Sequence, residues 1–178
     1  ITLINIISKI YSQNLLNRLT EWYTTNKKII DNQYGCQKGK STVDCIFLLH
    51  SVIAKTLSQG KKLYTAFVDI EKCFDKLERS YIFSKLFQEN VSSRFVKAIK
   101  SMYSSVKAAV RYKTSTSTFF VSNIGAKQGD PSSSLLFLYF INDLVNNINN
   151  DIDGLFTFDD VKLFVLLFAD DAVFFAHT

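Results

Sequence analysis

Apolar residues recur at helical spacing in the first part of the chain. Residues 3–23 predict an amphipathic helix whose apolar stripe consists of Leu3, Ile6, Ile7, Ile10, Leu15, Leu19 and Trp22. A polar stretch, 26–42, separates it from a second helical pattern, 43–57, that ends near Gly60. His50 falls within this second pattern, and we expect it to be a core or boundary histidine, not a catalytic one.

Strand and helix patterns alternate in the middle of the chain. Residues 63–69 (LYTAFVD) are rich in β-forming residues and predict a buried strand. Helical patterns follow at 72–88 and 92–106, the second with Ser92 as a candidate N-cap. The apolar side chains at 96, 99, 102, 103 and 106 share one face of that helix, which we assign to the core.

Two hairpins and a further helix are predicted in the second half. Residues 108–112 and 119–124 predict a hairpin with a Ser/Thr-rich loop. Asp130 and Pro131 suit the first positions of a helix, which we expect to end within the Asn-rich residues 146–150.

Residues 162–168 and 172–176 predict two strands around Ala169-Asp170-Asp171. The apolar run 163–176 is too short and too charged to span a bilayer. These patterns together predict an α+β domain with an antiparallel sheet packed on helices.

Composition and charge narrow the class of protein. The chain has 178 residues, of which 47% are hydrophobic, with a formal charge of +5 and a pI of about 9.0. This balance is compatible with a polyanionic partner and does not establish one. No signal peptide is visible, and the first residue is Ile1, so we expect a fragment of a larger protein. Cys36, Cys45 and Cys73 form no CxxC pair and predict free buried thiols, not a zinc site.

Asp170 and Asp171 form a carboxylate pair between two apolar segments. Adjacent carboxylates repel each other, and a hard cation such as Mg²⁺ removes that conflict. A second doublet, Asp159-Asp160, lies in a polar stretch with no expected strand before it, and we interpret it as a solvated turn. A solvated turn is also the alternative for the first doublet.

Asp69 supplies a third carboxylate because it ends the predicted strand 63–69, with the backbone carbonyl of Ile70 beside it. Two-metal phosphoryl-transfer sites hold ions about 3.5–4 Å apart with carboxylates from different strands. The residues alone therefore leave two interpretations open, metal-dependent phosphoryl transfer and a structural domain with incidental aspartates.

Four segments, in order, resemble the reverse transcriptase family, most closely the retroelement type without long terminal repeats. Residues 32–49 (NQYGCQKGKSTVDCIFLL) are similar to NQFGFRKGRST, and 66–77 (AFVDIEKCFDKL) to the first catalytic motif. Residues 126–144 (AKQGDPSSSLLFLYFINDL) resemble QGDPLSPLLF, and 166–176 (LLFADDAVFFA) resemble the F/Y-x-D-D hairpin. The opening helix also resembles the family's fingers-entry helix.

The resemblance implies roles for particular residues. Asp69, Asp170 and Asp171, with the backbone of Ile70, would ligate two Mg²⁺ ions, for which Mn²⁺ is a possible substitute. The implied nucleotide-binding residues are Phe74, Gln128, Gly129, Lys38 and Lys40. Phe74 matches the aromatic gate that crowds a ribose 2′-hydroxyl, and the lysines belong to a basic finger loop that neutralises a triphosphate.

The sequence departs from the family pattern at several positions. Gln37 and Lys40 stand where the family has arginines, which weakens bidentate phosphate contacts. Ser132 and Ser134 replace the usual Leu and Pro. The chain also stops before the family's primer grip and thumb, so we expect a catalytic palm that does not necessarily polymerise alone.

The resemblance implies helical fingers over 1–62, with a basic loop at 33–42, and a palm over 63–178. It implies a nucleotidyltransferase whose partners are an RNA template, a DNA primer and dNTPs, in the nucleus or cytoplasm and without a membrane. Three alternatives stay open: an RNA-dependent RNA polymerase, which Phe74 disfavours; a non-catalytic RNA-binding remnant; and a structural α+β domain.

Overall fold

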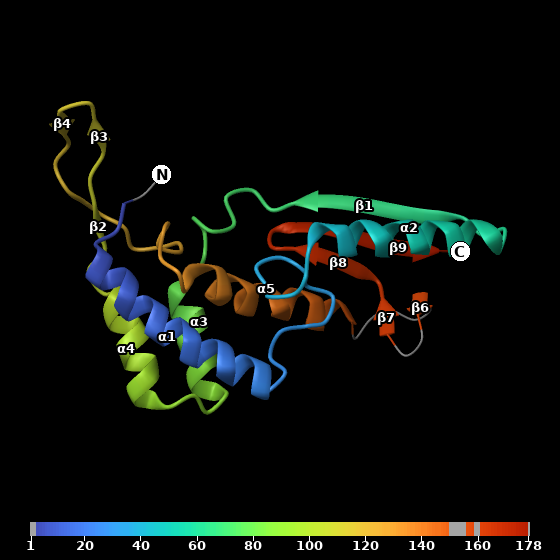
Figure 1. The fold of residues 1–178 in the computed structure, drawn as a ribbon, viewed down its shortest axis with the longest axis horizontal. Helices are drawn as coiled ribbons and strands as arrows, with labels where there is room; N and C mark the ends of the chain where they lie inside the picture. The colour runs from blue at the N-terminus through green and yellow to red at the C-terminus, as the bar shows by residue number, and fades with distance from the viewer. Residues whose placement is uncertain (1–2, 150–155, 159–160, 178) are drawn as a thin grey trace. The chain divides into compact units, whose positions relative to one another are not determined.

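A computed structural model describes residues 3–149, 156–158 and 161–177 (Figure 1). The chain divides into two compact units, which are described separately. Unit 1 comprises Ile1–Asn17 and Lys72–Leu136, and unit 2 comprises Arg18–Glu71 and Phe137–Thr178. Helices α1 (Ile6–Thr25) and α5 (Ser133–Asn149) each contribute residues to both units.

Unit 2 contains a three-stranded antiparallel sheet in the order β1-β9-β8. Its elements are α2 (Thr42–Ser58), β1 (Leu63–Asp69), β6 (Phe156–Phe158), β7 (Val161–Leu163), β8 (Val165–Phe168) and β9 (Asp171–His177). The register of β1 on β9 runs from Leu63 opposite His177 to Asp69 opposite Asp171. Short strands β6 and β7 pair with each other outside this sheet.

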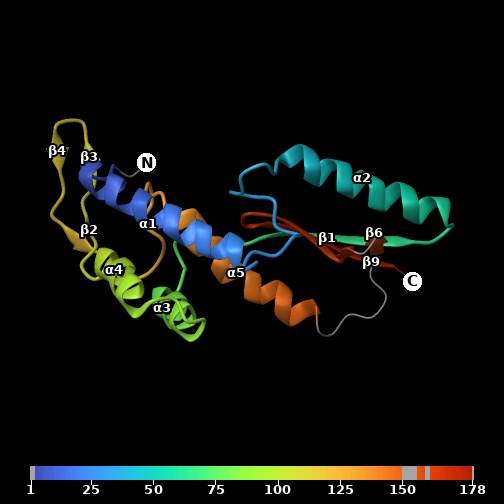
Figure 2. The same cartoon turned by 60° about the horizontal axis from the view of Figure 1, so that its bottom comes forward.

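The two faces of this sheet pack against different elements. On one face, Leu166 and Phe175 form a buried cluster with Val52 of α2, which runs alongside the sheet (Figure 2). On the other face, Leu167 and Ala172 pack with Val145 of α5. Side chains alternate between the faces of a strand, so these two clusters set the register of β8 and β9.

The loop that follows α1 is attached to α5 within unit 2. Asn142 donates a hydrogen bond to the carbonyl oxygen of Lys28 and accepts one from the backbone N–H of Ile30 at 3.4 Å. The Tyr23 and Tyr139 rings lie 4.8 Å apart between centroids. These contacts hold the segment that leads into residues 31–40.

Unit 1 packs α3 (Arg79–Gln88) against α4 (Ser93–Tyr103) through buried apolar side chains. A hairpin is confirmed in this region, as an outer pair, β2 (Lys107–Ala108) with β5 (Phe120–Val121), and an inner pair, β3 (Arg111–Tyr112) with β4 (Ser115–Thr116). Its predicted bounds are wrong, because β4 lies in the predicted Ser/Thr-rich loop and β5 ends at Val121. The predicted core face of α4 is confirmed at Val96, Ile99 and Tyr103, which are buried, whereas Met102 is half-buried and Val106 lies beyond the end of the helix.

Arg79 joins α3 to the segment that follows β5. Arg79 is 7% exposed, and its guanidinium donates to the carbonyl oxygens of Gly125 at 2.6 Å, Ser122 at 2.7 Å and Ile124 at 2.8 Å. It also lies 5.1 Å from the centre of the Tyr103 ring. A charge buried this deeply is tolerated because its donors are satisfied.

The strand predicted at 63–69 is present, but the expectation that it is buried is wrong. All of β1 except Leu63 is exposed, and Phe67 is 71% exposed. The physical reason is its position at the edge of the sheet, where only Leu63 joins the cluster under α2.

The helix predicted at 72–88 begins only at Arg79, after turns over 71–76. Lys72 has φ +54, and the carbonyl oxygens of Phe74 and Leu77 accept hydrogen bonds from Ala126 and Gly125. Those tertiary bonds take the place of helical ones. Ser92 occupies the N-cap of α4, as predicted, without a side-chain cap bond.

The strand predicted at 162–168 is divided at Phe164 into β7 and β8. The expectation that no strand precedes the second doublet is also wrong, since β6 ends at Phe158. Asp159 and Asp160 themselves lie outside the described residues.

Two expectations about side-chain burial are also corrected. His50 is exposed, because α2 packs on the sheet through Val52 with Leu48 and Leu49 and turns its other face outward. Among the cysteines, which are free as predicted, only Cys73 is buried. No helix in the described residues is long and apolar enough to cross a bilayer.

Candidate active site

The turn between β8 and β9 places the aspartate doublet at one end of the sheet. Phe168 and Asp171 are the last paired residues, so Ala169 and Asp170 alone form the turn. Ala169 has φ +57, the left-handed conformation that two-residue hairpins require at their first turn position. Asp170 therefore lies at the tip of the hairpin, and Asp171 is the first residue of β9.

Asp69 lies directly opposite Asp171 in the antiparallel register of β1 and β9. Residues opposed in this way project from the same face of a sheet, with Cβ atoms about 4.5–5.5 Å apart. Both side chains are exposed, and Ile70 follows directly on the end of β1. The structure thus brings together the three predicted carboxylates, two in register and one in the adjoining turn.

The donor chemistry of this end of the sheet suits a hard divalent cation. Mg²⁺ prefers carboxylate oxygens and retains several water ligands, so one or two protein carboxylates suffice for each ion. Within the described ranges, no group of three or more His, Cys, Asp and Glu side chains is arranged to hold a metal. The oxygen donors are of the type that magnesium prefers, and the register places Asp69 opposite Asp171, but the described side chains do not form a set of three metal ligands.

Residues 32–35 run beside the hairpin and pair with β8. Leu167 donates its N–H to the carbonyl oxygen of Asn32 at 2.9 Å, and Tyr34 donates to the carbonyl oxygen of Leu167 at 2.7 Å. Gly35 approaches so closely that a Cβ there would lie 2.2 Å from the backbone nitrogen of Ala169. Neither Gln33 nor Gly35 was predicted to have a role, although a glycine in a polar loop is a signal of such a close approach.

The two predicted nucleotide-binding lysines differ in their surroundings. Lys38 is exposed. The Lys40 ammonium donates to the carbonyl oxygens of Asp31 at 2.7 Å and Gln33 at 2.8 Å, and lies 4.7 Å from the centre of the Tyr34 ring. Burial lowers the pKa of Lys40 and raises that of Tyr34. Lys40 thus helps to fix the loop, whatever else it binds.

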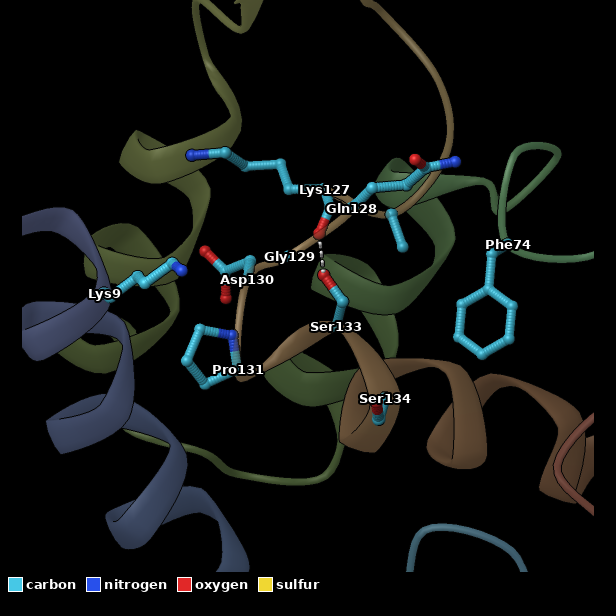
Figure 3. A pocket seen from close by; sticks show the side chains of 10 residues that line it. Lys9, Phe74, Lys127, Gln128, Gly129, Asp130, Pro131, Ser133 and Ser134 are labelled. Carbon is cyan, nitrogen blue, oxygen red and sulfur yellow. Dashed lines mark hydrogen bonds between the residues drawn. The ribbon is translucent and has the colours of Figure 1, made fainter. Parts of the chain in front are cut away.

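Unit 1 brings together the other predicted nucleotide-binding residues. Phe74, Gln128 and Gly129 line one open pocket of about 430 Å³. Figure 3 shows Phe74 on one side of this pocket and Lys9 on the other, with Gln128 between them. The Gln128 amide donates to the Asp75 carboxylate at 3.4 Å.

Asp130 anchors the entry to α5 at the edge of this pocket. Its Oδ1 accepts hydrogen bonds from the Ser132 N–H at 2.9 Å, the Ser132 hydroxyl at 2.6 Å and the Ser12 hydroxyl. The prediction that Asp130 and Pro131 open the helix is wrong by three residues, because α5 begins at Ser133 and the Asp130 carboxylate binds the turn before it. Ser132, one of the departures from the family pattern, supplies two of these bonds.

The predicted site residues thus fall into two sets. Asp69, Ile70, Asp170 and Asp171 belong to unit 2 together with the two lysines, and the three residues of the pocket belong to unit 1.

One protein-family model covers the whole chain, and individual relatives cover most of it. The family model described as "Reverse transcriptase (RNA-dependent DNA polymerase)" matches residues 1–178. The chain is 26% identical over 144 residues to "Probable RNA-directed DNA polymerase from transposon BS" of Drosophila melanogaster, covering 81% of the chain and 16% of the relative.

Two further relatives carry the name "Retrovirus-related Pol polyprotein". The one from type-2 retrotransposable element R2DM of Drosophila melanogaster is 27% identical over 92% of the chain and 15% of the relative. The one from type-1 retrotransposable element R2 of Nasonia vitripennis is 28% identical over 74% of the chain and 13% of the relative. The chain thus spans less than a quarter of each relative's length.

Proposed function

Because the chain belongs to the reverse transcriptase (RNA-dependent DNA polymerase) family, we propose that it forms the catalytic core of a retroelement polymerase that copies RNA into DNA. The match confirms the resemblance drawn from four sequence segments. The mixed helices and antiparallel sheet are compatible with a palm-like domain. The division into fingers over 1–62 and palm over 63–178 remains a proposal, as do the nuclear or cytoplasmic location and the activity of this chain by itself.

The observation that carries the proposal is the opposition of Asp69 and Asp171 beside the Asp170 turn. Two like charges directly opposite each other in a sheet are unfavourable unless a counter-charge is present. Two bound Mg²⁺ ions would supply that counter-charge and would stabilise the charge on the attacking 3′-hydroxyl and the leaving pyrophosphate. Asp69 and Asp171 present oxygens from two strands, and Asp170 adds a third carboxylate at the tip.

The remaining assignments concern nucleotide and template. We assign Phe74 to excluding a ribose 2′-hydroxyl, and Gln128 and Gly129 to contact with the templating base and the incoming nucleotide. The shared pocket of these three residues supports the assignment. Lys38 and Lys40 would neutralise the triphosphate, and the exposed side chain of Lys38 is the better placed for this. An RNA template, a DNA primer and dNTPs are the proposed partners.

Primer extension on an RNA template tests this proposal, with the chain continued by the thumb segment that the family resemblance implies. We expect Mg²⁺-dependent addition of dNTPs, with rNTPs used far less. A Phe74→Ala variant should lose the preference for dNTPs over rNTPs. The control Phe87→Ala, which replaces an exposed residue of α3, should keep that preference. Equal use of dNTPs and rNTPs by the parent would contradict the gate. Salt-sensitive RNA binding without any extension would favour the RNA-binding remnant.

A further inference from the structure

A glutamine with no assigned role is completely buried beside the aspartate hairpin. Gln33 is 0% exposed, although it lies in a polar loop. Its side-chain Oε1 accepts hydrogen bonds from the backbone N–H groups of Gly35 at 2.8 Å and Ala169 at 2.9 Å. Its Nε2 donates to the carbonyl oxygen of Ala169 at 3.3 Å. One side chain thus binds both backbone groups of the first turn residue.

The backbone of Gln33 is held as firmly as its side chain. Its N–H donates to the carbonyl oxygen of Ile30 at 3.2 Å. Its carbonyl oxygen accepts from the Gln37 amide at 2.6 Å and from the Lys40 ammonium at 2.8 Å. These are the two positions at which the sequence departs from the arginines of the family pattern. Gln33 therefore has little freedom to move away from the turn.

The turn itself depends on such support. Ala169 is buried and carries φ +57, a conformation that non-glycine residues adopt only when their surroundings stabilise it. Its buried N–H and carbonyl groups would lose their partners without the Gln33 amide, which is costly in a site away from water. Gly35 permits the contact, because a side chain there would collide with Ala169.

We propose that Gln33 is a positioning residue, whose side-chain amide fixes the Ala169-Asp170 turn and thereby the direction in which Asp170 and Asp171 present their carboxylates. The catalytic part of this inference rests on the proposed function. Gln33 touches neither substrate nor metal in this scheme and acts through the backbone of Ala169. Its loss should therefore alter metal affinity as well as the order of the turn.

Amide hydrogen exchange of the 178-residue chain tests the contact without any need for polymerase activity. In Gln33→Met, which keeps the volume and removes both kinds of hydrogen bond, the Ala169 and Gly35 amides should exchange at least about tenfold faster. Gln33→Glu keeps the acceptor oxygen and should protect these two amides better than Gln33→Met does. The control is Gln59→Met, at an exposed residue of the same unit, which should leave both rates unchanged. Equal protection in the parent and Gln33→Met overturns the proposal.

Mn²⁺ binding, followed by electron paramagnetic resonance on chains shown to be folded, provides the second readout. We expect Gln33→Met to weaken Mn²⁺ binding by about tenfold and Gln59→Met to leave it unchanged. A purely structural role would lower the melting temperature and leave the affinity of the folded chain unaltered, which would overturn the positioning role. If the parent shows a protected turn and binds Mn²⁺, but the chain continued by the thumb segment extends no primer, the proposed function fails and the Gln33 assignment stands.

Discussion

Asp69 of β1 and Asp171 of β9 are directly opposed at the last register position of their antiparallel pair, one residue from the hairpin turn that holds Asp170. The arrangement places two negative charges from distant parts of the sequence on one face of one sheet end. Opposed like charges destabilise a sheet pair by a few tenths of a kcal/mol to about 1 kcal/mol. Such an arrangement is unfavourable for stability alone, and the Mg²⁺ ions that we propose would offset the repulsion.

Magnesium should therefore stabilise the parent chain and not a variant that lacks one of the opposed charges. Without metal, Asp69→Asn should melt at or slightly above the temperature of the parent, because the repulsion is relieved. With millimolar Mg²⁺, the melting temperature of the parent should rise and that of Asp69→Asn should not. Glu21→Gln, which removes an exposed charge from α1, should respond to Mg²⁺ as the parent does. An equal Mg²⁺ shift in parent and Asp69→Asn would contradict the metal assignment.

Gly35→Ala should destabilise the chain because the new Cβ would lie 2.2 Å from the Ala169 nitrogen and 2.8 Å from the Phe168 carbonyl carbon. Both are backbone atoms that cannot rotate away, so we expect a loss of about 1–3 kcal/mol or more in the free energy of unfolding. Urea unfolding measures it. Gly39→Ala is the comparison, since Gly39 has φ +82 and nothing within 4 Å, and backbone conformation alone costs about 1–2 kcal/mol.

If Gly35→Ala proves no more harmful than Gly39→Ala, the close approach of residues 32–35 to the hairpin is wrong. Hydrogen exchange of the Ala169 amide should also accelerate in Gly35→Ala and not in Gly39→Ala, because only the first substitution separates Gln33 from the turn.

Local patterns in the sequence were enough to predict most elements and the aspartates that lie together. Helical spacing predicted α1, α2 and α4, and nearby strand patterns predicted the hairpin of β2 to β5. Asp69 and Asp171 could be placed because each lies at the end of a strand formed by a continuous run of β-forming residues. The doublet could be recognised because charged residues interrupt an apolar run. Each of these signals is carried by neighbouring residues.

What could not be predicted depends on tertiary contacts. The exposed face of β1 follows from its place at the sheet edge, and the late start of α3 follows from hydrogen bonds of Phe74 and Leu77 with residues about 50 positions later. Gln33 belongs to no helical or strand pattern and carries no charge, so the sequence does not single it out. Its contact with the hairpin turn exists only because the fold brings residues 32–35 beside Ala169. Nothing in the amino-acid composition indicates that a polar side chain in a loop will be buried.

Arg79→Lys should destabilise unit 1 strongly. The guanidinium serves three backbone carbonyls and the Ser122 hydroxyl in a planar arrangement that an ammonium cannot reproduce. Hydrogen bonds to charged groups contribute about 1.5–3 kcal/mol each, so losing two should lower the free energy of unfolding by about 3 kcal/mol or more. Arg94→Lys, at an exposed position of α4, should change it by less than about 0.5 kcal/mol. Similar effects of the two substitutions in urea unfolding would refute the structural role of Arg79.

Alkaline pH should weaken the fold through Tyr103. Burial raises the pKa of Tyr103 above its ordinary value of 10.0, and the nearby charge of Asp130 adds to the rise. A raised pKa in the folded state means stability that is complete below about pH 10 and is lost as pH rises through the folded pKa. Urea unfolding between pH 9 and 11 should show this loss in the parent. Tyr103→Phe should show a smaller loss over that interval, and an identical pH profile would contradict the assignment.

The most direct test of the central claim is Asp170→Asn in RNA-templated primer extension with Mg²⁺ and dNTPs, using the chain continued through a thumb segment. Replacing this carboxylate, which we propose to ligate Mg²⁺, with an amide should lower the extension rate by at least about 100-fold, while RNA binding and the melting temperature stay close to those of the parent. Glu21→Gln should extend at the parental rate. Extension by Asp170→Asn at the parental rate would show that the aspartate hairpin is not the catalytic metal site.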